Sequence, residues 1–230
     1  MFSDVFLAMT AGEITHNPCK KPAYMACHFS AWNKGLSNQP ATLPPGSIIL
    51  LDDSMELQDH DPVLITQQLQ TLAEQFQPAA VLMDFQREPT EQMMHFLDCC
   101  IGQLPCPIAV PIAYADPYDC PVFLAPLPFD MFLKDYLDPW LERGIYLELA
   151  LDGITITVEE NGSRIQPLPP GFSDTLPLQD SKLYCHYDVK TTDTQAIFTL
   201  CRTRQDIASL LQEATALGIR GAVGLYQELG

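Results

Sequence analysis

The chain has 230 residues, of which 47% are hydrophobic, so it can enclose a sizeable core and is neither fibrous nor disordered overall. Its 12 Lys and Arg residues are outnumbered by 29 Asp and Glu residues, which gives a formal net charge of −17. This charge repels nucleic-acid backbones and anionic membrane surfaces, and no apolar run is long enough for a membrane-spanning helix. We therefore expect neutral or cationic partners, and neither nucleic acid nor a membrane.

Short apolar runs alternate with helical patterns from residue 47 onward. Strands are predicted at 47–51, 79–85, 107–113, 121–127, 145–151 and 219–226, with a further candidate at 23–29. Helices are predicted between them, from Asp61, Thr90, Phe132 and Ile207 onward. This alternation indicates a mainly parallel sheet covered by helices. We predict an α/β fold of the (β/α)8 TIM-barrel type, complete or trimmed at its N-terminal end, and an open doubly wound sheet is the alternative.

Residues 152–201 follow a different pattern. Asp152-Gly153 and Glu160-Asn161-Gly162 are turn signals, and the run 154–158 between them is β-branched. Further strands are predicted at 183–189 and 195–201, after a proline-rich stretch. We predict a single domain over residues 1–230, with a β-hairpin-rich insertion region at 145–201 before the last helix and strand.

Signals for cofactors and for export are weak. The eight cysteines are scattered and include no C-x-x-C pair, so neither a disulfide framework nor a metal site is predicted. No glycine-rich phosphate loop follows a predicted strand, so no cofactor is expected. The N-terminus has no basic residue before its apolar stretch, which Asp4 interrupts, and we therefore expect a cytoplasmic protein. The pattern does not predict an oligomeric state.

Several segments resemble one family. Residues 217–230 (LGIRGAVGLYQELG) resemble the ending of family 18 glycoside hydrolases, the chitinase-like barrels, and especially of their bacterial spore-cortex and peptidoglycan-directed members. Residues 79–86 (AAVLMDFQ) lie where that family has its fourth-strand signature, D-G-x-D-x-D-x-E. Residues 108–111 look like its fifth strand, and 127–130 (LPFD) resemble the M-x-Y-D motif that ends its sixth strand. The resemblance implies a barrel that acts on glycans containing N-acetylglucosamine.

The chain departs from the family pattern at the acid. Gln86 occupies the position of the family's catalytic Glu, and Asp84 is the one Asp of the signature that is kept. Phe129 replaces the Tyr that would contact the acyl group of the substrate, although Asp130 is kept. In the family, the substrate's own N-acetyl group attacks the anomeric carbon while the Glu protonates the leaving oxygen. An amide can hydrogen-bond to that oxygen but cannot supply the proton.

The resemblance therefore implies a chitinase-like pseudoenzyme that binds an amino-sugar glycan or a peptidoglycan fragment. The candidate catalytic positions are Gln86 and Asp84, and the candidate substrate contacts are Asp130, Phe129, Tyr226 and Tyr114. Each has a plainer interpretation, because a strand-end Asp, a Gln at the barrel mouth or a Tyr in a core is also ordinary.

Two other functions stay open. One is an active glycoside hydrolase whose acid is displaced to Glu88, Asp116 or Glu148. The other is a protein-interaction scaffold with no sugar site, which a barrel mouth filled by apolar side chains would favour.

Overall fold

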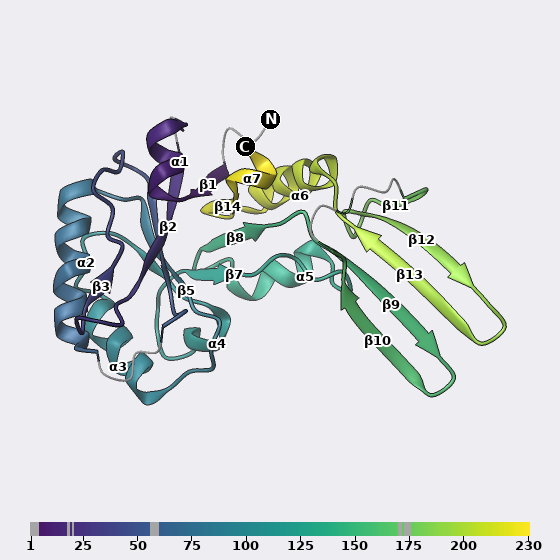
Figure 1. The fold of residues 1–230 in the computed structure, drawn as a ribbon, viewed down its shortest axis with the longest axis horizontal. Coiled ribbons are helices and arrows are strands. Elements are labelled where there is room, and N and C mark those ends of the chain that lie inside the picture. The colour runs from purple at the N-terminus through teal and green to yellow at the C-terminus, as the bar shows by residue number, and fades with distance from the viewer. Residues whose placement is uncertain (1–4, 18, 20, 56–59, 170–171, 173–175) are drawn as a thin grey trace.

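The structure is a computed structural model that describes residues 5–17, 19, 21–55, 60–169, 172 and 176–230. It consists of a barrel and a separate antiparallel sheet that extends away from the barrel (Figure 1). Among the described residues, no helix has both the length and the apolar character needed to cross a bilayer.

Within the described residues, eight parallel strands form the barrel, in the spatial order β6-β5-β4-β2-β1-β14-β8-β7. They are β1 (Val5–Met9), β2 (Pro22–Phe29), β4 (Ile48–Asp52), β5 (Ala80–Asp84), β6 (Ile108–Ala109), β7 (Val122–Leu124), β8 (Ile145–Leu149) and β14 (Gly221–Leu225). The short β3 (Leu36–Ser37) pairs antiparallel with β2.

A parallel bridge between Val110 and Val122 joins β6 to β7 and closes the ring. The Val110 amide donates to the Pro121 carbonyl at 3.1 Å, and the Phe123 amide donates to the Val110 carbonyl at 2.8 Å. The prediction of a (β/α)8 barrel is confirmed, with its N-terminal strands in place. An open doubly wound sheet is excluded because its two edge strands would not be bonded to each other.

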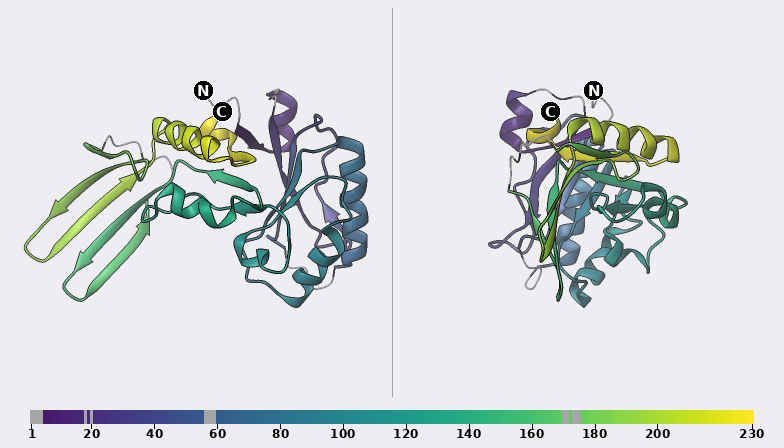
Figure 2. Two further views of the ribbon diagram at one scale, coloured as in Figure 1. Left: turned by 180° about the vertical axis from the view of Figure 1, so that it is seen from behind. Right: turned by 90° about the vertical axis from the view of Figure 1, so that its right-hand side faces the viewer.

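Helices surround the barrel (Figure 2). They are α1 (Ala11–His16), α2 (Pro62–Phe76), α3 (Glu91–Cys100), α4 (Ile112–Ala115), α5 (Leu133–Leu137), a 3₁₀ turn (Asp138–Trp140), α6 (Arg204–Leu217) and α7 (Tyr226–Leu229). Local chemistry fixes their ends: Asp61 caps α2, Thr90 caps α3, and Gly218 ends α6 in the left-handed region at φ 97°.

The barrel strands are apolar on both faces because both faces are buried. In β4, Ile48 and Leu50 belong to a cluster inside the barrel, whereas Ile49 and Leu51 pack against the surrounding helices. All four side chains are at most 6% exposed. The unbroken apolar run within 47–51 therefore indicates a strand that is buried on both faces.

The part of the chain between β8 and α6 forms a second sheet, which we call the wing sheet. Within the described residues it has five antiparallel strands in the order β10-β9-β13-β12-β11. They are β9 (Gly153–Glu159), β10 (Gly162–Pro167), β11 (Leu178–Asp180), β12 (Cys185–Thr191) and β13 (Gln195–Cys201). Of the region 145–201, residues Ile145–Leu149 pair within the barrel as β8, and the wing sheet itself begins at Gly153.

Several predicted strands differ in extent from the observed ones, and one observed strand was missed. The strand predicted at 121–127 is reduced to Val122–Leu124. The strand predicted at 107–113 is reduced to Ile108–Ala109, because Pro107 and Pro111 flank it and Pro111 starts α4 instead. The strand predicted at 23–29 is β2, but β1, which begins at Val5, was not predicted.

Candidate functional site

The candidate site is the mouth of the barrel, where the carboxyl ends of the parallel strands meet. Strand pairing sets three polar side chains at one level, because His28 pairs with Asp52 and Asp52 pairs with Asp84. Asp52 and Asp84 continue the alternation of Leu50 and Leu82, which belong to the inner cluster. Both carboxyl groups therefore point into the barrel.

Gln86 lies just beyond β5, and hydrogen bonds fix its orientation. Its side-chain Nε2 donates to Oδ1 of Asp84 at 2.7 Å. The backbone amides of Gln86 and Arg87 donate to the two carboxylate oxygens of Asp53, each at 3.0 Å. Asp53 is only 4% exposed, so its carboxylate holds the turn that follows β5. The two candidate catalytic residues, Gln86 and Asp84, are thus bonded to each other.

Glu148 enters the same space from another strand. It lies on β8, two residues after the inward-facing Tyr146, and pairs with Val223 of the inner cluster. Two strands, β6 and β7, separate β8 from β5 along the ring. Glu148 and Asp84 therefore approach each other from different sides of the barrel, and the charge of Asp84 acts on Glu148.

The buried carboxyl groups of the mouth have shifted pKa values. Burial raises the pKa of Asp84, the hydrogen bond from Gln86 opposes the rise, and the charges of Asp52 and Asp53 add to it. Burial also raises the pKa of Glu148 to about 7, with further contributions from the charges of Asp84, Glu228 and Asp152. A carboxyl group with this pKa is partly protonated near neutral pH, as a proton donor must be.

A buried arginine connects the mouth to the base of the wing sheet. The Arg202 side chain, 1% exposed, donates from Nη1 to both oxygens of Asp152, at 3.0 and 3.1 Å. Its Cζ lies 4.1 Å from the ring centroid of Phe129, in the loop after β7. Among the described residues, Nε and Nη2 of Arg202 have no hydrogen-bond partner, so the aromatic ring is what stabilises that side of the guanidinium.

The remaining predicted contacts lie in different environments. Asp130 is exposed on the loop after β7. Tyr226 is half-buried and begins α7, directly after β14, on the opposite side of the barrel from β5. Tyr114 is 1% exposed, its hydroxyl donates to the Arg87 carbonyl at 2.9 Å, and its ring packs edge-on against Phe85. Tyr114 thus supports the loop that carries Gln86.

The three positions considered for a displaced acid differ strongly. Glu88 and Asp116 are exposed, whereas Glu148 is partly buried inside the barrel mouth. Sequence reasoning did not single out Asp52, Asp152 or Arg202 as site residues. The available signal for Asp52 was its place at a strand end, one strand before Asp84, but only the strand register sets the two side by side.

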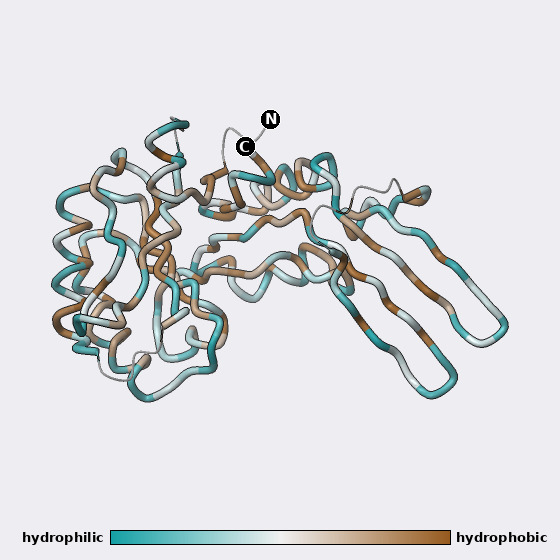
Figure 3. Tube along the Cα trace, viewed as in Figure 1, coloured by the Kyte–Doolittle hydropathy of each residue, from teal (hydrophilic) through white to brown (hydrophobic). Residues whose placement is uncertain are grey.

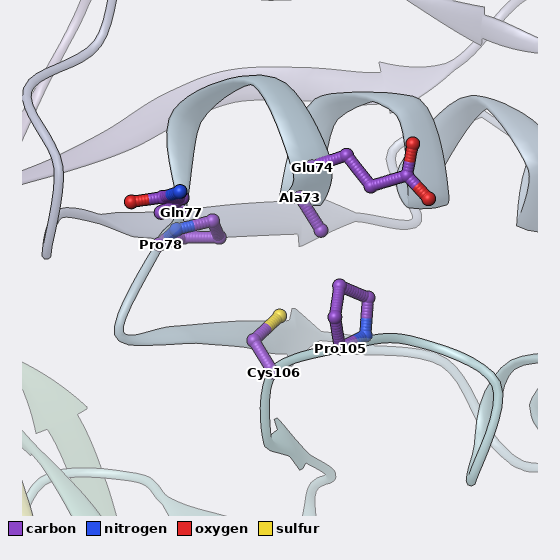
Figure 4. A pocket seen from close by; sticks show the side chains of 6 residues that line it. All are labelled: Ala73, Glu74, Gln77, Pro78, Pro105 and Cys106. Carbon is purple, nitrogen blue, oxygen red and sulfur yellow. The ribbon is translucent and has the colours of Figure 1, made fainter.

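A cavity of about 350 Å³ lies away from the mouth, among residues that precede β5 and β6 (Figure 4). Its lining residues are Ala73, Glu74, Gln77, Pro78, Pro105 and Cys106. Burial raises the pKa of the Cys106 thiol to about 11, so this cysteine stays protonated and unreactive. The cavity contains none of the predicted site residues. In the part of the chain that the structure describes, no group of three or more His, Cys, Asp or Glu side chains is arranged to hold a metal ion.

A (β/α)8 barrel with polar groups at the carboxyl ends of its strands is a common enzyme architecture. No family model and no curated protein matches the sequence. Solved structures do match its fold. The spore cortex-lytic enzyme SleL from Bacillus cereus is 11% identical, with a TM-score of 0.56, and the match covers 98% of this chain and 70% of SleL.

Chitinases match as well. A chitinase from Chromobacterium violaceum is 9% identical, with a TM-score of 0.54, and the match covers 96% of this chain and 93% of that enzyme. A family 18 chitinase from Cycas revoluta, a double mutant in complex with (GlcNAc)4, is 10% identical, with a TM-score of 0.56 and coverage of 97% and 94%. The fold is therefore that of family 18 chitinases and spore cortex-lytic enzymes, as the sequence motifs implied.

Proposed function

We propose that this protein binds a glycan containing N-acetylglucosamine, such as a chitin or peptidoglycan fragment, at the barrel mouth and does not hydrolyse it. The observation that carries the proposal is the amide of Gln86. It sits at the end of the fourth barrel strand, where the resemblance places the family's acid, and it donates to Asp84. A primary amide offers hydrogen bonds to a sugar oxygen but no proton for a leaving group.

Two further observations support glycan binding. The mouth carries polar groups directed inward, Asp52, Asp84 and Glu148, rather than an apolar plug, which argues against a scaffold without a sugar site. One of the two substitutions in the Cycas revoluta chitinase that is in complex with (GlcNAc)4 replaces a Glu by Gln. A Gln in this fold is thus compatible with an oligosaccharide complex.

The test compares binding and turnover in matched variants. Calorimetry with chitotetraose and with muropeptides should detect binding to the wild type, and product analysis should detect no cleavage. Gln86→Glu restores a carboxyl group at the acid position, and Gln166→Glu makes the same chemical change on the exposed strand β10. Clear hydrolysis by the wild type, or no binding of either glycan, would overturn the proposal.

A second function is favoured by the environment of Glu148. Burial and neighbouring carboxylates raise the pKa of this inward-facing acid to about 7, which suits a general acid. In this case the wild type would cleave a glycan, with a rate that falls as the pH rises above 7. Glu148→Gln would then lower turnover by about 10²–10⁴-fold, whereas Glu142→Gln, at an exposed position, would leave it unchanged.

A further inference from the structure

The wing sheet has one continuous apolar face. Residues that are directly paired across an antiparallel sheet project from the same face. One row of partners crosses four strands and consists of Ile165, Ile156, Phe198 and Val189. Every member of this row is apolar, and Figure 3 shows hydrophobic positions recurring along β9 and β13.

The next row on the same side is also uncharged and crosses the whole sheet. It consists of Pro167, Ile154, Leu200, Tyr187 and Leu178. We call these two rows together the apolar face. The opposite face is different, because the row between them there consists of Gln166, Thr155, Thr199 and Asp188, which are all polar.

The apolar face is exposed at its margins and partly exposed at its centre, on β9 and β13. Ile165 is 63% exposed, Leu178 45% and Val189 36%. The hairpins that carry the face extend beyond the barrel in Figure 1 and in the left view of Figure 2. An antiparallel sheet normally turns its apolar face towards a core, and exposed apolar patches of this kind mark interaction surfaces.

The apolar face is large enough to form an interface with the same face of a second copy of this chain. Five strands spaced about 4.8 Å apart, with about six residues each rising about 3.3 Å, give a flat area on the order of 450 Å². Two such faces in contact would bury roughly 1,000 Å² in total, which is where specific interfaces begin. Two sheets of equal width and twist can pack about 10 Å apart with their strands nearly aligned.

The net charge of the chain also bears on how a second copy can bind. The chain carries a net charge of −17, so two copies repel each other over most of their surface. Neither row of the apolar face contains a charged side chain. This face is therefore a place where a second copy can approach without burying a carboxylate against another.

We propose that the apolar face of the wing sheet packs against the same face of a second copy of this chain, forming a two-fold symmetric β-sandwich between the two barrels. The contact between the two apolar faces is hydrophobic, whereas the negative charges on the rest of the two chains repel each other. Salt screens the repulsion between the two chains, so association should increase with ionic strength.

Sedimentation equilibrium of the full chain over a range of concentrations tests the proposal. The wild type should form a dimer, with a dissociation constant that decreases between low and high sodium chloride. Ile165→Lys places a charge at the edge of the apolar face, and Gln166→Lys places the same charge on the other face of the same strand. Ile165→Lys should weaken dimerisation at least about tenfold, and Gln166→Lys should not.

Circular dichroism of each variant checks that it is folded, and Val189→Lys provides a second disruption on a different strand. A wild type that stays monomeric at high protein and salt concentrations would overturn the proposal. So would equal weakening by Ile165→Lys and Gln166→Lys, or a dimer that dissociates as salt is added.

Discussion

The barrel and the wing sheet use strands in opposite ways. In β4 and β5 of the barrel, nearly every side chain is buried, and the ring has no free edge because Val110 and Val122 close it. In β10 of the wing sheet, all six residues are exposed. Closure therefore buries both faces of a strand, whereas an open sheet leaves two edges, here β10 and β11, and an apolar face to be covered by something else.

The first and largest predicted difference follows from truncating one apolar side chain in the barrel and one in the wing sheet. Leu51→Ala, at a position with 0% exposure in the barrel, should lower the free energy of unfolding by about 3 kcal/mol, because it leaves a cavity. Ile165→Ala, at a position 63% exposed in β10, should change it by less than about 0.5 kcal/mol. Urea denaturation of both variants measures the difference, and equal losses would contradict it.

The second concerns the barrel mouth and pH. The pKa of Glu148 is about 7 in the folded protein, against a reference of 4.5, so the folded state retains a proton that the unfolded state has lost between these values. Stability should therefore fall as the pH rises from 4.5 to 7. Glu148→Gln removes this dependence and should be more stable than the wild type above pH 7, by on the order of 2–3 kcal/mol.

Denaturation at pH 4.5 and pH 8 measures the effect of Glu148→Gln. Near pH 4.5 the variant and the wild type should differ little, because the carboxyl group is neutral in the folded state and only half ionised in the unfolded state. Glu142→Gln, at an exposed position, is the control. The prediction is wrong if both variants show the same change with pH.

The third prediction concerns Arg202, which connects the barrel mouth to the wing sheet. Arg202→Ala removes the partner of Asp152 and the contact with Phe129. It should destabilise the protein by about 2 kcal/mol, less than for a fully buried pair, because the Asp152 side chain is 35% exposed. Hydrogen exchange should become faster in β9 and β13, and Arg164→Ala, on the exposed strand β10, should leave the exchange unchanged.

The smallest expected effect concerns a helix end next to the wing sheet. Thr203 caps α6, accepting from the Asp206 amide, and the Asp206 carboxylate accepts from the backbone and hydroxyl of Thr203. Thr203→Ala should cost about 1 kcal/mol in thermal or chemical unfolding. Thr71→Ala, on the exposed side of α2, should cost less than about 0.5 kcal/mol, and a loss as large as that of Thr203→Ala would contradict the capping role.

The sequence predicted the elements that depend on local chemistry. The apolar run at 47–51, the cap at Thr90 and the turn at Glu160-Asn161-Gly162 predict a buried strand, a helix start and a hairpin from a few neighbouring residues. β1 was missed because five residues with one interrupting Asp before them give little periodicity to detect. The order of several motifs predicts that Gln86 follows the fourth strand, and the structure has it just beyond β5, while its role at the mouth stays a prediction.

The sequence alone therefore predicts the kind of fold and the insertion before the last helix, and its resemblance to family 18 predicts that an amide stands at the position of the family's acid. Only the tertiary structure decided what surrounds that amide. The pairing of Asp52 with Asp84, the inward position of Glu148 and the contact of Arg202 with Phe129 join residues from separate strands and loops. Such contacts depend on strand register and ring closure, which are set by packing over the whole chain and leave no local pattern in the sequence.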